Sequence, residues 1–144
     1  MEDFRFREFS EDDRAAAEEL HSSCMEKQRA SFSKDFNIKN LKDLKKNNET
    51  IAFSAESNNG DFAGYIWAVI IESSLYINTL EVKPEYRGLG IGKVLLENLM
   101  KKIDRTKVLR IFADLPVEAE GFSRVLLREG FYAGITRYCL DLND

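Results

Sequence analysis

The stretch LYINTLEVKPEYRGLGIGKVLLENLMKKI, residues 75–103, decides how the rest of the chain is interpreted. Apolar and polar residues alternate up to Val82, which predicts a β-strand, and a helical repeat follows from about Gly90. Between them, Arg87, Gly90 and Gly92 form an R-x-x-G-x-G sequence. Glycines at the start of a helix let backbone N–H groups approach an anion, because the first four donors lack intrahelical partners. The stretch therefore predicts a phosphate-binding turn.

Two common phosphate-binding loops do not fit this turn. A Walker loop needs Gly where Arg87 stands, and Ser or Thr for magnesium where Val94 stands. A Rossmann fingerprint that begins at Gly88 needs a third glycine at Lys93, although Asp114 loosely matches the acidic residue expected about 20 residues later. An ordinary turn that packs a helix tightly against a strand is the alternative for the same glycines.

The pattern resembles motif A of the GNAT family of N-acetyltransferases, which transfer an acetyl group from acetyl-CoA to an amine. The matching residues are Leu80, Val82, Pro84, Arg87, Gly88, Gly90, Gly92 and Lys93. The resemblance implies that acetyl-CoA is the acyl donor and that the turn binds its pyrophosphate through Arg87, Gly88, Leu89, Gly90, Ile91, Gly92 and Lys93. It also implies that Leu80, Glu81 and Val82 pair with the pantetheine arm as an added strand would.

The other predicted elements alternate between strands and helices. Apolar alternation predicts a strand at Phe4 to Arg7, and Ser10 with Asp13 predicts a helix that starts near Glu11. The pair Asn59-Gly60 predicts a hairpin turn. Further strands are expected at 51–56, 62–71, 75–82 and 108–113, helices around 41–44, at 90–103 and from Pro116 to Gly130, and two closing strands within 131–142.

Helical periodicity also predicts which residues face the core. The inward residues are expected to be Ala16, Leu20, Cys24 and the stem of Lys27 in the first helix, Ile91, Val94, Leu95, Leu99 and Ile103 at 90–103, and Ala119, Phe122, Val125 and Leu126 in the last helix. The apolar run 62–71 is expected to be covered on both faces. The resemblance of the element order to the GNAT fold implies an α/β (α+β) fold with a mixed, mostly antiparallel sheet flanked by helices. The chain is expected to form one such domain, residues 1–144.

The residues at the catalytic positions match the family less well than the residues of the turn do. In the family a carboxylate or histidine commonly deprotonates the amine from the positions that hold Asn78 and Tyr76 in this chain. Asn78 could hold a water, and Tyr76 could receive a proton. Two carboxylates are also candidates, Asp114 first and Glu81 second. An N-cap role is the alternative for Asp114, and an exposed position on the strand, on the pleat face opposite Asn78 unless a bulge intervenes, is the alternative for Glu81.

The segment from Arg124 to Phe131 resembles the late helix of the family, which often carries a tyrosine as general acid. Leu126 stands at that position. Protonation of the leaving thiolate would then come from water or from Tyr132 or Tyr138, or would not be needed, because a thiol with a pKa of about 8.5 leaves readily near neutrality.

The expected activity is acetyl transfer to a primary amine, either a protein or peptide N-terminus or a small amine. An α-amino group has a much lower pKa than a lysine side chain, so a site with weak bases should favour it. Phe32, Asp35 and Phe36 are candidates for contact with the acceptor. The alternative function is a catalytically weak acyl-CoA-binding sensor or interaction module on the same fold.

Bulk properties narrow the partners and the location. A net charge of −4 and a pI near 5.2 argue against a general nucleic-acid binder. The sequence has no run of about 18 apolar residues and no signal-like N-terminus, and Cys24 and Cys139 fit a reducing compartment, so a cytoplasmic protein without membrane partners is expected. A homodimer is among the expected partners. His21 is the single histidine, with too few companions for a metal site.

Overall fold

A five-stranded sheet forms the centre of the computed structural model, which describes residues 3–27, 49–113 and 120–133. The strands lie in the order of the chain: β1 Phe4–Glu8, β2 Glu49–Ser57, β3 Phe62–Ile71, β4 Ser74–Val82 and β5 Arg110–Ala113. Neighbouring strands are antiparallel except β4 and β5, which are parallel. This mixed, mostly antiparallel sheet confirms the predicted fold class.

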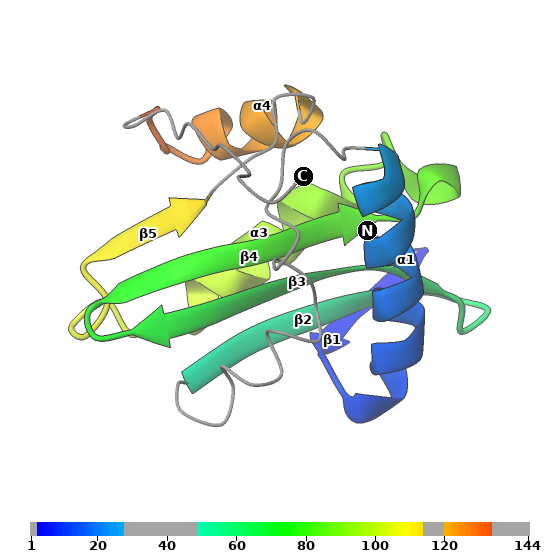
Figure 1. Cartoon of the computed structure of the whole chain (residues 1–144), viewed down its shortest axis with the longest axis horizontal. Helices are drawn as coiled ribbons and strands as arrows, with labels where there is room; N and C mark the ends of the chain where they lie inside the picture. The colour runs from blue at the N-terminus through cyan, green and yellow to red at the C-terminus, as the bar shows by residue number, and fades with distance from the viewer. Residues whose placement is uncertain (1–2, 28–48, 114–119, 134–144) are drawn as a thin grey trace, which may run out of the picture.

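Helices cover both faces of the sheet. The short helix η1 Glu11–Asp13 leads into α1 Arg14–Lys27, which crosses the front face in Figure 1. The helices η2 Pro84–Tyr86 and α3 Ile91–Lys102 follow β4, and α3 lies behind the sheet, with α4 Glu120–Arg128 above it. One apolar cluster lies between the sheet and α3, and a smaller one lies between the sheet and α1.

The strand β3 is buried on both faces, as its apolar run predicted. Ile66 and Ala68 belong to the cluster on the α3 side, whereas Tyr65, Trp67 and Val69 belong to the cluster on the α1 side. Side chains alternate along a strand, so these two sets of β3 residues mark the α3 face and the α1 face of the sheet.

The other predicted strands among the described residues, the glycine hairpin, both ends of α3 and the end of α4 agree closely with the structure. The turn between β2 and β3 has Gly60 at φ +86° and is closed by a 2.8 Å hydrogen bond from Ser57 N to Asp61 O. At the end of α4, Gly130 has φ +96°, and Phe131 N donates to Leu126 O at 3.0 Å. This pattern is the glycine-terminated helix end that the sequence predicted.

Each of two predicted helix faces differs from the structure at one residue. In α1 the predicted Leu20 is buried and Cys24 packs beside it, but Ala17, not Ala16, is buried with them, because residues three and four apart share one helical face. In α3 Leu96 is buried together with Leu95, whereas Val94 is only half-buried. The apolar face of α3 is therefore wider than a single stripe, as suits a helix that lies flat on a sheet.

Other predictions fall wholly or partly outside the described residues. They are the helix around Leu41 and Leu44, the start of the last helix at Pro116 and Ala119, and the closing strands beyond residue 133. Residues 131–133 are described and are not in a strand.

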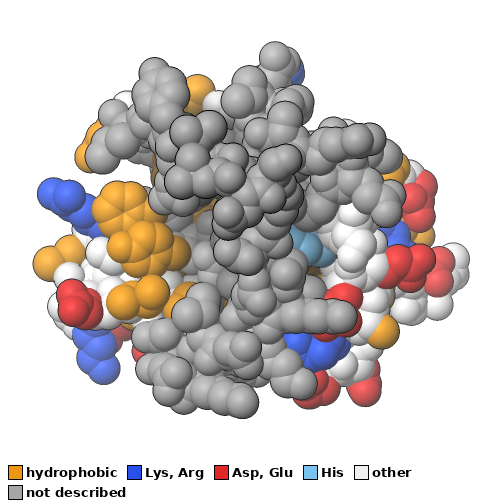
Figure 2. All heavy atoms as spheres, in the orientation of Figure 1, with side chains coloured by type: hydrophobic (Ala, Val, Ile, Leu, Met, Phe, Trp, Pro, Cys, Tyr) orange, Lys and Arg blue, Asp and Glu red, His pale blue; other side chains and the backbone are white. Residues whose placement is uncertain are grey.

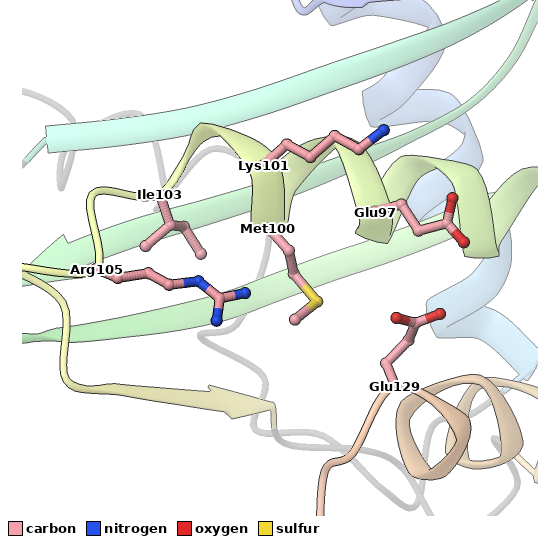
Figure 3. A pocket seen from close by; sticks show the side chains of 6 residues that line it. All are labelled: Glu97, Met100, Lys101, Ile103, Arg105 and Glu129. Carbon is pink, nitrogen blue, oxygen red and sulfur yellow. The ribbon is translucent and has the colours of Figure 1, made fainter.

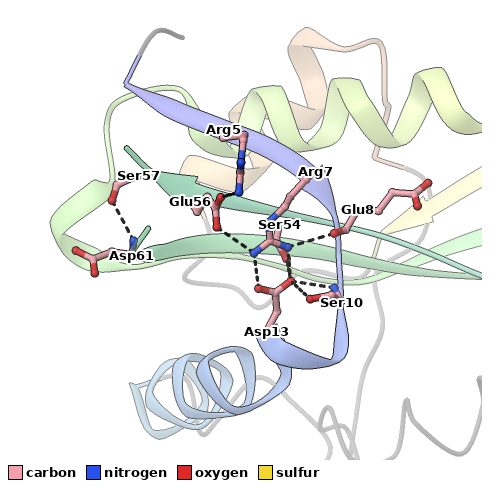
Figure 4. Close-up of polar contacts among 9 residues, drawn as sticks. All are labelled: Arg5, Arg7, Glu8, Ser10, Asp13, Ser54, Glu56, Ser57 and Asp61. Atoms are coloured by element: carbon pink, nitrogen blue, oxygen red, sulfur yellow. Dashed lines mark hydrogen bonds and ion pairs between the residues drawn. The ribbon is translucent and has the colours of Figure 1, made fainter. Parts of the chain in front are cut away.

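A network of charged residues fixes the start of α1 against the sheet (Figure 4). The guanidinium of Arg7 donates to both carboxylate oxygens of Asp13, at 2.7 and 2.8 Å. The hydroxyl of Ser54 and the N–H of Ser10 each donate to Asp13 at 2.9 Å. Burial opposes ionisation of Asp13 most strongly, but these hydrogen bonds outweigh it, so the pKa of Asp13 is lowered.

Candidate active site

Among the described residues, β5 pairs with only the first half of β4, so the edge of the second half of β4 has no strand partner there. Parallel pairing with β5 joins Ser74 through Ile77 to Arg110 through Ala113 and goes no further in the described part of the chain. Residues 79–82 remain paired with β3 on the other side. An open strand edge presents backbone N–H and C=O groups to a ligand that can pair like a strand. The segment that the GNAT resemblance assigned to pantetheine, Leu80 to Val82, lies on this edge.

The open edge leads directly into the glycine turn. Gly88 and Gly90 have φ values of +79° and +87°, which a residue with a side chain adopts only with strain. Gly90 is the N-cap of α3, and its carbonyl accepts a hydrogen bond from Val94 N at 3.2 Å. The amides of Ile91, Gly92 and Lys93 precede that bond, so they have no acceptor within the helix and are available to an anion.

Gly92 differs from the other two glycines of the turn. Its φ is not positive, and an added Cβ would meet only Leu80 Cδ2 at 4.0 Å, which is ordinary contact. The protein alone therefore has room for a methyl group at this position. Close approach of a ligand to the helix start would explain a glycine there.

Arg87 connects the turn to two other elements. Its Nε donates to Val82 O at 2.9 Å, and its second terminal nitrogen lies 3.9 Å from Cys24 Sγ on α1. The side chain therefore holds the end of β4 and reaches α1. Lys93 is exposed, and its Nζ lies 3.9 Å from Glu97 Oε1.

A β-bulge at Asn78 changes which side chains of β4 face α1. Thr79 pairs with Trp67 and Ile77 pairs with the next residue of β3, so Asn78 has no partner on β3. Before the bulge, Leu75 and Ile77 pack on the α3 side. After it, the residues on that side are Leu80 and Val82. The extra residue thus shifts the alternation by one and turns Glu81 toward α1.

Glu81 meets two polar side chains on this face. Its Oε1 accepts a short hydrogen bond from the hydroxyl of Tyr65, directly opposite on β3, and lies 3.0 Å from His21 Nδ1. The side chain of Glu81 is 12% exposed and that of His21 is 5% exposed. The expectation that Glu81 is an exposed strand residue is therefore wrong, because the bulge directs it to the interface with α1.

Tyr65 is the donor in its bond to Glu81. Burial, followed by the nearby negative charge of Glu81, raises the pKa of the Tyr65 phenol well above its usual value. The phenol stays protonated and donates its O–H to the carboxylate. Within the described residues, the second oxygen of Glu81, Oε2, makes no hydrogen bond or ion pair.

The remaining predicted residues are placed differently. Asn78 Nδ2 is buried and has no acceptor among the described residues. Tyr76 is 38% exposed and stacks on Phe112 with ring centroids 5.3 Å apart. Figure 2 shows hydrophobic side chains gathered at the left, over the region where β4 and β5 begin. Leu126 is buried in the α3-side cluster, and Tyr132 is 84% exposed. Asp114, Tyr138, Phe32, Asp35 and Phe36 lie outside the described residues.

Sequence reasoning did not foresee the roles of three residues near Glu81. No local pattern connects His21 or Tyr65 with a strand so distant in the sequence. Gly64 did carry a signal, since glycine inside an apolar strand often marks close backbone approach. In the structure, a Cβ at Gly64 would lie 2.6 Å from the carbonyl oxygen of Glu81.

A cavity of about 340 Å³ lies elsewhere, between α3 and α4 (Figure 3). It is lined by Glu97, Met100, Lys101, Ile103, Arg105 and Glu129. These residues lie around the C-terminal half of α3, away from the glycine turn at its N-terminus, so this cavity is not part of the open edge. Among the described residues, no group of three or more His, Cys, Asp and Glu is arranged to bind a metal. No described helix is both long and apolar enough to cross a membrane.

Comparison with solved structures finds the same fold in several proteins described as acetyltransferases. An acetyltransferase from Trypanosoma brucei has a TM-score of 0.73 and 22% identity, covering 97% of this chain and 100% of that chain. The PaiA N-acetyltransferase from Thermoplasma acidophilum, in complex with coenzyme A, has a TM-score of 0.74 and 19% identity, covering 93% and 92% of the two chains. A predicted acetyltransferase from Clostridium acetobutylicum with acetyl-CoA has a TM-score of 0.74 and 16% identity, covering 96% of each.

At these identities the likeness shows the shared fold. Sequence comparison with curated proteins gave no significant match. A model of the Acetyltransferase (GNAT) family, however, matches residues 11–122, which include α1, the open edge of β4 and the glycine turn. Because that match covers well over half of the chain, the chain belongs to the acetyltransferase (GNAT) family.

Proposed function

We propose that this protein is an acetyl-CoA-dependent N-acetyltransferase that transfers the acetyl group directly to a primary amine. The observation that carries the proposal is the continuity of the open edge of β4 with the glycine turn that begins α3. A pantetheine arm can pair with the edge while its pyrophosphate reaches the helix start, so one extended molecule satisfies both features. The PaiA structure in complex with coenzyme A and the Clostridium structure with acetyl-CoA, which share this fold, support this choice of donor.

The residues of this chain fit acetyl-CoA. Residues 80–82 would pair with pantetheine, and the amides of residues 87–93 would hold the pyrophosphate. Helix-start amides and the helix dipole favour anions, the dipole by about 0.3 to 1 kcal/mol for each exposed charge. Acetyl-CoA supplies the activated thioester, whose carbonyl carbon is attacked by the amine.

The chain must then provide a hydrogen-bond donor for the thioester oxygen and an acceptor for the amine proton. The buried Nδ2 of Asn78 is a donor without an acceptor at the bulge, directly beside the open edge. We assign to it the binding of the carbonyl oxygen or of a water that contacts it. Glu81 and Asp114 are the proposed proton acceptors, and Tyr76 is a further candidate for that role.

The proposed acceptor is an amine of low pKa, such as the α-amino group of a peptide or a small amine. Forming the neutral amine at pH 7 costs about 4 to 5 kcal/mol for a lysine side chain, but only about 1 to 1.4 kcal/mol for an α-amino group. Leu126 replaces the usual tyrosine acid and is buried in the core, so the thiolate must leave without help from that position.

Release of CoA in the presence of a panel of amines tests the proposal. The rate, corrected for hydrolysis without amine, should rise with amine concentration and saturate for at least one class of acceptor. If the protein binds acetyl-CoA but no amine accelerates CoA release, the acyl-CoA sensor is the better account. If it does not bind acetyl-CoA, both functions fail.

A further inference from the structure

We propose that Glu81 accepts the amine proton through Oε2, and that Tyr65 and His21 are positioning residues that hold its Oε1. The inference rests on the proposed function and assigns its proton acceptor. It also brings a residue of α1 into the machinery, although the sequence indicated no role for His21 beyond that of a helix residue.

The two oxygens of the Glu81 carboxylate have different surroundings. Oε1 receives the hydroxyl of Tyr65 and lies 3.0 Å from Nδ1 of His21. Oε2 makes no hydrogen bond or ion pair with the described residues, and the Glu81 side chain is 12% exposed. Here the unused oxygen is the one available to a substrate.

The location of the carboxylate follows from the bulge. Without a bulge at Asn78, strict alternation would place Glu81 on the α3 face with Leu75 and Ile77, inside the apolar core. With it, Glu81 lies on the α1 face of the segment that has no β5 partner. Bulges commonly redirect a side chain beside an active site. The carboxylate is therefore on the open half of β4, where acetyl-CoA is proposed to bind.

The protonation states of the two partners favour this role. Tyr65 keeps its proton and can only donate to Glu81 near neutral pH. When Nδ1 of His21 also carries a proton, it donates to the same oxygen. Two contacts to the same oxygen hold the plane of the carboxylate, so Oε2 keeps one direction.

The proposed step is balanced within the site. The neutral amine attacks the thioester carbon, the N–C bond forms, and the C–S bond breaks with its electron pair on sulfur. The extra proton on nitrogen passes to Oε2 of Glu81. The products are the amide, the CoA thiolate and the protonated carboxyl group, which later loses its proton to solvent.

Glu81→Gln tests the proton acceptor, because it keeps the shape of the side chain and removes its basicity. The expected result is a fall in kcat of about 100- to 10,000-fold, the range for loss of a general base, with the acetyl-CoA Kd changed less than about twofold. Glu19→Gln, on the exposed side of α1, is the matched control and should leave both constants unchanged. A Glu81→Gln enzyme with kcat within about threefold of the parent would overturn the assignment.

Double variants test the positioning residues. Tyr65→Phe and His21→Leu each remove one donor to Oε1 and should lower kcat about 10-fold or more with little change in KM. Because both residues act through Glu81, adding either change to Glu81→Gln should cause no further loss. His21→Asn, which keeps a donor near the position of Nδ1, should recover most of the activity. Full additivity of the losses would contradict positioning through Glu81.

The single histidine gives a readout that does not depend on turnover. Nitrogen NMR of the whole protein above pH 8 should show His21 with its proton on Nδ1, and Glu81→Leu should shift the proton toward Nε2. An unchanged tautomer would show that the pair does not form in solution. If the amine panel gives no reaction but the tautomer shifts as expected, the pair exists and the proposed function has failed.

Discussion

Nδ1 of His21 lies 3.0 Å from Oε1 of Glu81, although sixty residues separate them in the sequence. The contact joins α1 to the half of β4 that has no β5 partner, and Arg87 makes a second connection between the same helix and the end of β4. The helix is thus fixed along the strand edge proposed to bind acetyl-CoA. A shift of α1 would move the Glu81 carboxylate and the glycine turn together.

The glycines of the turn should differ in what they contribute. Gly90→Ala forces a side chain into φ +87°, so we expect a loss of stability of about 1 kcal/mol or more and weaker acetyl-CoA binding. Gly92→Ala meets only ordinary contact at 4.0 Å and should leave thermal stability unchanged. It should nevertheless raise the acetyl-CoA Kd if a ligand approaches the helix start closely.

Thermal unfolding and calorimetric titration of the two variants separate these effects. A stable Gly92→Ala protein with unaltered affinity would mean that this glycine serves no ligand. Gly60→Ala, in the distant hairpin with φ +86°, is the control for backbone strain alone and should not affect affinity.

Gly64 should be required for the position of Glu81. A Cβ there would lie 2.6 Å from the carbonyl oxygen of Glu81 and 3.1 Å from Val82 Cα, so the backbones of β3 and β4 would have to separate. We expect Gly64→Ala to lower both the stability and kcat, by about 1 to 3 kcal/mol for the overpacking. Urea unfolding and CoA-release rates measure the two losses. A variant of normal stability and activity would contradict the close approach of these strands.

The free energy of unfolding should depend on pH through the carboxylate of Asp13. Its folded pKa is lowered, because the hydrogen bonds from Arg7, Ser10 and Ser54 outweigh its burial. Its contribution to the free energy of unfolding is therefore complete above the unfolded pKa of about 3.9 and is lost as the pH falls through the lower folded pKa.

Urea unfolding of Asp13→Asn at two pH values tests this contribution. At pH 7 we expect a loss of about 1 to 3 kcal/mol relative to the parent, the range for hydrogen bonds to a charged group. Below pH 3 the difference should shrink. Asp12→Asn, at an exposed neighbour, serves as the control. A difference that stays the same at both pH values would show that the charge of Asp13 is not what stabilises the fold.

The acceptor preference can be measured directly with matched amines. A peptide with a free N-terminus and an acetylated lysine should be acetylated faster near pH 7 than the same peptide with a blocked N-terminus and a free lysine, because its amine is far less protonated. At pH 9 the ratio of kcat/KM for the N-terminal peptide to kcat/KM for the lysine peptide should move closer to one. Faster reaction of the lysine peptide at pH 7 would contradict the proposed preference.

Local patterns were sufficient to predict much of the fold. The strands β2 to β4, the hairpin at Gly60, α3 and the glycine turn follow from alternation, helical repeat and turn chemistry, which act over a few residues. On α1 the predicted Leu20 and Cys24 do pack against the sheet, but Ala17 rather than Ala16 shares their face, because it lies three residues before Leu20.

The candidate site could be predicted only in part. The glycine turn and the edge of β4 were recognisable, whereas the face of Glu81 depends on the bulge at Asn78, which leaves no mark in the alternating sequence. The partners Tyr65 and His21 reach Glu81 only through tertiary packing. Asp114, the first choice for a base, lies outside the described residues and stays a prediction.

Calorimetric titration of the whole protein with acetyl-CoA tests the central claim most directly, namely that the strand edge and the turn before α3 bind the thioester donor. The account predicts saturable binding of one acetyl-CoA per chain, weakened at least tenfold by Gly90→Val, which strains the turn. Absence of binding by the folded parent protein, or equal affinity of the Gly90→Val protein, would contradict it.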